Sequence, residues 1–138
     1  MTDASLSPEQ QERVVAIALD LAREGRTRDL LEFIDHGLPI DVTDAAGNTP
    51  LMLAAYHGRP ETVTALIERG ADVDLRNARD QSPLAGALFK GEDAVVRALV
   101  AAGADLDAGP PSARAAAELF GKVGLLEEAT DDGGGASP

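Results

Sequence analysis

The sequence predicts an all-α solenoid, in which antiparallel pairs of short helices are stacked and joined by hairpin-like finger loops. The first observation is a repeat, because Gly25, Gly58, Gly91 and Gly124 follow one another at intervals of 33 residues. The second is that residues 47–74 hold two apolar helical stripes, each too short to form a stable helix alone. The third is a composition of 44% hydrophobic but only 3% aromatic residues, which suits thin aliphatic layers. Short helices that need neighbours, at a fixed period, indicate stacked repeats.

The first expected repeat, residues 7–42, differs most from the others. Ser7 and Gln10 form a capping-box pattern, so we expect a helix from there to Glu24 and a second helix over about 27–35. The polar first turn suits the water-facing side of an end repeat. The apolar stripe of the first helix is expected to comprise Val14, Ile17, Ala18, Leu21 and Ala22.

The second repeat, residues 43–75, carries the clearest signals. Thr49 is placed to cap its first helix, and Pro50 takes the first helical position, where its missing N–H costs nothing. Pro60 is placed to open the second helix and Gly70 to end it. The apolar residues at helical spacing are Leu51, Ala54 and Ala55 in the first helix and Val63, Leu66 and Ile67 in the second.

The third repeat, residues 76–108, follows the same pattern, with helices expected near 83–90 and 93–102. Asp80 occupies the glycine position of its finger turn, and aspartate tolerates left-handed geometry better than most residues. A partial fourth repeat is expected over 109–129, with Ser112 capping its helix. The 33-residue spacing aligns Ala115, Ala116 and Ala117 with the cap region Thr49, Pro50 and Leu51, and it aligns Gly124 with the end of the helix.

The repeated motifs resemble those of the ankyrin repeat family. Thr49-Pro50-Leu51 returns as Ser82-Pro83-Leu84, and the segment 70–74 (Gly-Ala-Asp-Val-Asp) returns as 103–107 (Gly-Ala-Asp-Leu-Asp). The resemblance is close over residues 43–109, and it implies a finger loop and two helices per repeat. It specifies the fold more than the function. Met52 and Ala85 stand where the family usually carries histidine.

Composition narrows the possible partners. The net charge of −12, from 24 acidic and 12 basic residues, disfavours nucleic acid and anionic membranes. No stretch approaches the roughly 20 apolar residues that span a bilayer, and no secretory signal is visible. The lack of cysteine favours a reducing compartment, so a cytoplasmic protein is expected. We also expect a monomer. The composition is rich in Ala and Gly and poor in Lys, which hints at a bacterial source. Residues 1–6 and the acidic, Gly-rich residues 130–138 are expected to be disordered.

Neither a metal site nor catalysis is expected. Asp41, Asp74 and Asp107 lie in register, but neighbouring helices pack about 8–10 Å apart, whereas calcium needs 6–8 oxygens within about 2.6 Å. We therefore expect these carboxylates to accept hydrogen bonds within their own fingers. His36 and His57 occupy non-equivalent positions with no nucleophile beside them, so we expect no enzyme activity and no cofactor.

The resemblance implies that a partner contacts the finger tips and the exposed end of each first helix. Tyr56 and Phe89 occupy equivalent positions there, and Tyr and Arg are typical of binding hot spots. The alternative is that Phe89 packs between repeats and the arginines only keep the surface soluble. The expected partner-binding residues are Thr43, Ala45, Ala46, Asn48, Tyr56 and His57, then Arg76, Ala78, Arg79, Gln81, Phe89 and Lys90, with Arg23 and Glu24 from the first helix.

We therefore expect a non-enzymatic adaptor that binds a protein partner through its finger tips and concave helix face. One alternative is an acidic inhibitor or antitoxin-like protein, whose outer surface with Glu61, Glu68, Glu92 and Asp93 masks a basic or nucleic-acid-binding partner. Another is a bare scaffold that only oligomerises.

Overall fold

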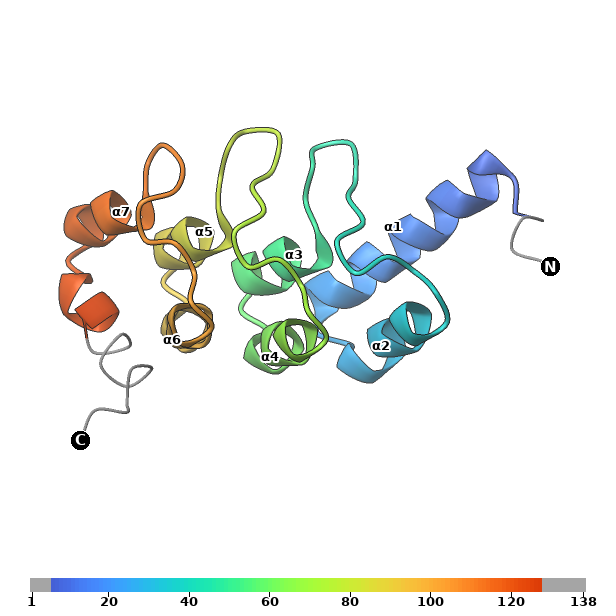
Figure 1. Cartoon of the computed structure of the whole chain (residues 1–138), viewed down its shortest axis with the longest axis horizontal. Coiled ribbons are helices and arrows are strands. Elements are labelled where there is room, and N and C mark those ends of the chain that lie inside the picture. Colours follow the sequence, from blue (N-terminus) through green and yellow to red (C-terminus); the bar gives the residue numbers. More distant parts are fainter. Residues whose placement is uncertain (1–5, 128–138) are drawn as a thin grey trace.

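The computed structural model describes residues 6–127, and these form an elongated stack of helix pairs (Figure 1). Within this range the chain contains helices and loops and no strand, so the predicted all-α class is confirmed. The expected disorder at 1–5 and 130–138 concerns residues outside the described range. The helices are α1 (Pro8–Glu24), α2 (Thr27–Asp35), α3 (Pro50–Tyr56), α4 (Pro60–Glu68), α5 (Pro83–Lys90), α6 (Asp93–Ala101) and α7 (Ala113–Phe120), followed by helical residues 123–127.

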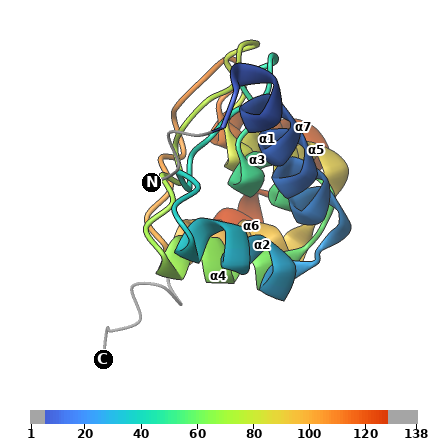
Figure 2. The same cartoon turned by 90° about the vertical axis from the view of Figure 1, so that its right-hand side faces the viewer.

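The helices form two parallel rows. We call α1, α3, α5 and α7 the inner helices, and α2, α4 and α6 the outer helices. Three finger loops rise on one side of the stack (Figure 1), and the view along the stack shows inner helices, outer helices and fingers as three sides of the molecule (Figure 2). We call the surface between the finger loops and the inner helices the concave surface.

Each inner helix begins at a hydroxyl side chain that caps it. Ser7, Thr49, Ser82 and Ser112 each accept a hydrogen bond from the backbone N–H three residues further on, at 3.0–3.1 Å. These bonds satisfy donors that the first turn of a helix leaves unpaired, so the same local chemistry starts every inner helix. The predicted capping box of Ser7 is confirmed, because its backbone N–H also donates to Gln10.

The strict 33-residue register is wrong after residue 108. The third finger loop, between α6 and α7, is three residues shorter than the other two. The predicted cap at Ser112 is confirmed, and it lies three residues before Ala115, the position that a constant 33-residue spacing would give. The left-handed glycine that ends the helix is Gly121 (φ 71°), whereas Gly124 lies inside the helical residues 123–127. The deletion moves the cap and the glycine together, so the fourth helix pair starts early.

The core lies between the two rows of helices and repeats along the stack. Its largest side chains are leucines and valines that are almost fully buried. One predicted stripe needs correction: in α1 the buried residues are Ala18, Leu19 and Ala22, while Ile17 is 45% exposed. The stripe that faces α3 is therefore rotated from the one expected. The core leucines are Leu30, Leu51, Leu66, Leu84 and Leu99.

The fingers are linked to one another through backbone N–H groups. Asp41 accepts a hydrogen bond from the N–H of Asp72 at 3.2 Å, and Asp74 accepts one from the N–H of Asp105 at 2.7 Å. The expectation that all these carboxylates bond within their own fingers was therefore wrong for Asp41 and Asp74. It was also wrong for Asp107, whose carboxylate accepts from the Arg114 side chain of α7 at 2.9 Å. Asp72 and Asp105, a second pair in register, do bond within their own fingers and accept from the N–H groups of Asp74 and Asp107. The acidic positions hold adjacent fingers at a fixed spacing.

Candidate interaction surface

Two adjoining cavities lie on the concave surface. The first, of about 400 Å³, lies between the tips of the first two fingers and the ends of α1 and α3, and we call it the finger-tip cavity. The second, of about 490 Å³, lies over α3, α5 and α7, and we call it the apolar groove. Met52, Tyr56 and Gln81 line both cavities, so the two form a continuous depression along the inner helices.

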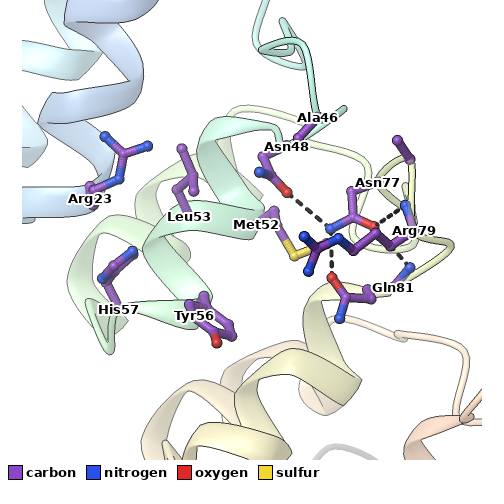
Figure 3. Close-up of a pocket in the computed structure, with 11 residues that line it drawn as sticks. Arg23, Ala46, Asn48, Met52, Leu53, Tyr56, His57, Asn77, Arg79 and Gln81 are labelled. Carbon is purple, nitrogen blue, oxygen red and sulfur yellow. Dashed lines mark hydrogen bonds between the residues drawn. The ribbon is translucent and has the colours of Figure 1, made fainter.

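A network of amides fixes the shape of the finger-tip cavity (Figure 3). The Asn77 side-chain NH₂ donates to the Asn48 side-chain oxygen at 3.0 Å and to the Gln81 side-chain oxygen at 2.8 Å. The Asn77 oxygen accepts from the backbone N–H groups of Arg79 and Gln81 at 2.9 and 3.0 Å. The N–H of Ala78 donates to the carbonyl of Ala46 at 2.8 Å. These bonds join the two finger tips before any partner arrives, which lowers the ordering cost of binding.

The finger-tip cavity has a positive electrostatic environment. Its basic lining residues are Arg23, His57 and Arg79, and among the described residues no acidic side chain lines either cavity. Burial lowers the pKa of His57 below its usual range, and the positive charges of Arg23, Lys90 and Arg59 lower it further. The imidazole is therefore neutral at pH 7 beside several cations. This environment stands out in a chain with a net charge of −12.

Two carboxylates that lie near the cavities already form hydrogen bonds or an ion pair within the chain. Asp44 accepts from the backbone N–H groups of Ala46 and Asn48, both at 2.9 Å, so its charge serves the finger turn. Asp80 forms an ion pair with Arg76, with a separation of 3.1 Å between the carboxylate oxygen and Nε. These contacts leave Arg79 and Lys90 as cations at the mouth of the depression.

The apolar groove has a floor of small residues and walls of large ones. Its floor contains Gly86 of α5 together with alanines of α5 and α7. Phe89 is 63% exposed and Leu119 is 77% exposed, so these walls face solvent. The alternative that Phe89 packs between repeats is therefore wrong. The Phe89 and Phe120 rings meet edge to face, with their centroids 5.7 Å apart.

Lys90 lies beside Tyr56, a residue that lines both the finger-tip cavity and the apolar groove. Its ammonium nitrogen lies 4.9 Å from the centroid of the Tyr56 ring, and the Tyr56 ring meets His57 edge to face at 5.6 Å. A cation over an exposed aromatic face is stabilised by about 0.5–1 kcal/mol. This contact holds a positive charge beside the apolar groove.

The structure gathers most, but not all, of the predicted binding residues at these cavities. Thr43 and Ala45 are exposed on the first finger but line neither cavity. Arg76 of the second finger, Lys90 at the end of α5 and Glu24 at the end of α1 are also exposed and line neither cavity. The side chain of Arg76 lies against the third finger near Gly109 instead. The predicted residues that line the depression are Ala46, Asn48, Tyr56, His57, Ala78, Arg79, Gln81, Phe89 and Arg23.

The analysis of the sequence missed the wall of the groove that α7 supplies. Leu119 lies 30 residues after Phe89, so it is the counterpart of Phe89 once the shorter third finger is taken into account. The signal was available, because aligning the fourth repeat on its Ser112 cap brings Leu119 into register. Lining residues outside the predicted set are Met52, Leu53, Asn77, Ala85, Gly86, Pro111, Ala115, Ala116, Leu119 and Phe120.

Comparison with known families agrees with this architecture. The sequence model described as "Ankyrin repeats (3 copies)" matches residues 19–109, more than half of the chain. The chain belongs to the ankyrin repeat family. Ankyrin repeats are generally protein–protein interaction modules, without catalytic activity of their own. No curated protein matches the chain.

Two further properties bear on function. Within residues 6–127, no helix is long and apolar enough to cross a membrane. In the same range, no three or more side chains of His, Cys, Asp or Glu are grouped so that they could hold a metal ion. On the concave surface, the two cavities are the candidate binding sites for a ligand.

Proposed function

We propose that this ankyrin repeat chain is a non-enzymatic adaptor that binds a protein partner through its concave surface. The observation that carries the proposal is the continuous depression around Met52, Tyr56 and Gln81, which no acidic side chain of residues 6–127 lines. In a chain with twice as many acidic as basic residues, a surface of this kind selects an acidic, partly apolar partner.

The residue types on this surface support the proposal. Tyr56 and the arginines are of the types that carry most binding energy in protein interfaces. Tyr56 is 36% exposed, and Phe89 is more exposed still, so both are available to a partner. An aromatic centre with a polar rim is the usual anatomy of such interfaces.

The outer helices offer less support for the acidic-inhibitor alternative. Asp93 pairs with Lys122 at 3.1 Å, and Asp35 receives two hydrogen bonds from the Arg69 guanidinium at 3.1 and 3.2 Å. The Arg69 hydrogen bonds hold the pKa of Asp35 below its usual value. Asp93, one of the four carboxylates named for that alternative, is therefore engaged within the stack, as is Asp35 of α2.

The extent and setting of the module are part of the proposal. We propose one ankyrin domain over residues 7–129, with repeats at about 7–42, 43–75 and 76–108 and a partial repeat after them. We also propose that it acts in the cytoplasm, which its lack of cysteine favours, and that it is a monomer without a cofactor.

Affinity capture from the cell that carries this chain tests the proposal. The concave-surface variant combines Arg79→Glu and Lys90→Glu, and the matched outer-surface variant combines Glu61→Gln and Glu68→Gln. All four side chains are exposed, so both variants should fold, and circular dichroism checks this. We expect the concave-surface variant to lose a partner that wild type and the outer-surface variant both retain. The opposite pattern would favour the acidic-inhibitor function.

A further inference from the structure

We propose that the concave surface binds one extended acidic segment of the partner, with a large apolar side chain anchored over Gly86. Carboxylates of the same segment then lie against Arg79 and Lys90. This inference rests on the proposed function and specifies the chemistry of the partner. The bound segment of the partner is expected to be short, because both parts of the site belong to one continuous depression.

Gly86 creates the space for the anchor. It occupies the position in α5 that Leu53 occupies in α3, and Leu53 is buried there. A Cβ atom added to Gly86 would meet only the Tyr56 ring, at 3.5 Å, which is ordinary van der Waals contact. Glycine destabilises the interior of a helix relative to alanine, yet nothing in the packing requires it here. Its consequence is an open apolar position beneath Tyr56 and Phe89.

The walls of the groove determine that the guest is apolar. Tyr56, Phe89, Leu119 and Phe120 surround the floor, and Phe89 and Leu119 expose most of their surface. Covering these side chains with an apolar group removes their surface from water, which is the main favourable contribution to such binding. A single large side chain such as Leu or Phe reaches all four walls at once.

Charge determines what flanks the anchor. Arg79 lines the adjoining cavity and Lys90 lies over Tyr56, while Arg23, which also lines that cavity, is paired with Asp20. Among residues 6–127, no carboxylate lines either cavity. A second copy of the chain is a poorer occupant, because an isologous dimer would set these cations against themselves. The chain's own residues 128–138 carry carboxylates but no large apolar side chain to fill the groove.

The spacing of the repeats sets the spacing within the segment. Packed helices lie about 8–10 Å apart, and an extended chain advances about 3.3 Å per residue. One repeat therefore corresponds to about three residues of the bound segment. The anchor lies over α5, whereas the cavity that Arg79 lines lies at the ends of α1 and α3, one to two repeats away. We therefore expect about three to five residues between the anchor and the carboxylate that meets Arg79.

Selection from a phage-displayed library of random twelve-residue peptides tests this specificity. We expect wild type to enrich peptides with Leu, Ile, Phe or Met about three to five residues from Asp or Glu. The tightest peptide is then synthesised and its affinity measured by fluorescence anisotropy. Failure to enrich any peptide, or enrichment of basic or purely polar peptides, would overturn the proposal.

Gly86→Leu is the decisive variant, because it fills the groove from below without removing a contact. We expect it to weaken the peptide at least about tenfold, and Leu119→Ser to weaken it severalfold, since each removes anchor contact. Thr64→Leu adds the same side chain to the exposed surface of α4 and should leave affinity unchanged. Leu119 is so exposed that its variant keeps the test valid if Gly86→Leu folds poorly. Equal binding by wild type and the groove variants would overturn the proposal.

Two controls separate this inference from the proposed function. If capture of the natural partner depends on Arg79 and Lys90 but survives Gly86→Leu, the anchored-segment proposal is wrong while the adaptor function stands. If capture ignores all three positions, both are wrong. If sedimentation shows a wild-type dimer that Gly86→Leu dissociates, the groove holds a second copy and the segment proposal is wrong.

Discussion

Among single residues, His57 gives the most direct evidence for the positive electrostatic environment of the concave surface. It follows the last turn of α3 as the C-cap residue, beside Tyr56. Burial and the nearby cations Arg23, Lys90 and Arg59 all disfavour its charged form. Asp20 pairs with Arg23, so Arg79 and Lys90 are the cations of this surface that a negatively charged partner would contact.

We predict that His57 titrates below the ordinary histidine value of about 6.5 in the folded chain. Because the unfolded chain takes up this proton first, stability falls as the pH drops below about 6.5 towards the folded pKa. The His57→Gln variant should lose less stability than wild type over that range. NMR titration of the imidazole and urea unfolding at several pH values measure both effects. A His57 pKa at or above the ordinary value would contradict the cationic environment.

At the scale of elements, caps and loops decide where each helix begins. The inner helices have only seven or eight residues after α1, so packing stabilises them and the cap sets their position. The third finger shows the consequence. Because this loop is three residues shorter, the fourth inner helix begins three residues earlier in the sequence, and Leu119 and Phe120 therefore form part of the wall of the apolar groove.

We predict that Ser112→Ala destabilises α7 by about 0.5–2 kcal/mol, the usual cost of losing an N-cap. The Ser112 hydroxyl accepts the N–H of Ala115 at 3.1 Å, and alanine cannot replace that bond. Hydrogen exchange should show faster exchange in α7 with little change in α3. Ala115→Ser is the matched control, since the 33-residue register would place the cap there. If Ser112→Ala leaves α7 unchanged, the assignment of this cap is wrong.

The elements could be predicted from sequence where their signals are local. Ser or Thr caps, Pro at the first helical turn and glycine after the last turn locate most helix ends to within a residue. Leu119 was missed because a deletion within a loop changes a long-range register that local patterns assume constant. The bonds of Asp41 and Asp74 to the next finger were missed because they depend on how repeats approach each other in space. The two cavities depend on that same approach.

At the scale of the whole molecule, neighbouring repeats hold each other in place. Besides the core contacts, the Thr27 and Thr62 hydroxyls form a hydrogen bond of 2.6 Å that links α2 to α4. Near the ends of the same two helices, the Arg69 side chain donates a hydrogen bond to Asp35. The contacts run from each repeat to the next, as expected of a solenoid. Stability is therefore shared along the stack, and the rigid row of inner helices keeps both cavities aligned.

We predict that Leu66→Ala costs about 2–5 kcal/mol, because Leu66 is fully buried in α4 near the middle of the stack. In a short solenoid this cavity can also separate the unfolding of the two ends into steps. Urea titration followed by circular dichroism measures both effects. A loss below about 1 kcal/mol would show that the stack tolerates a cavity at its centre, contrary to the packing described above.

The central claim is that a protein partner occupies the concave surface, and site-specific photo-crosslinking tests it most directly. Benzoylphenylalanine replaces Phe89, which is 63% exposed in the wall of the groove, and in a separate variant it replaces the exposed Thr64 of α4. Irradiation in the cell that carries the chain then joins each position to whatever lies against it. We predict a discrete crosslinked partner from position 89 and none from position 64. A discrete product from position 64, with none from position 89, would contradict the account.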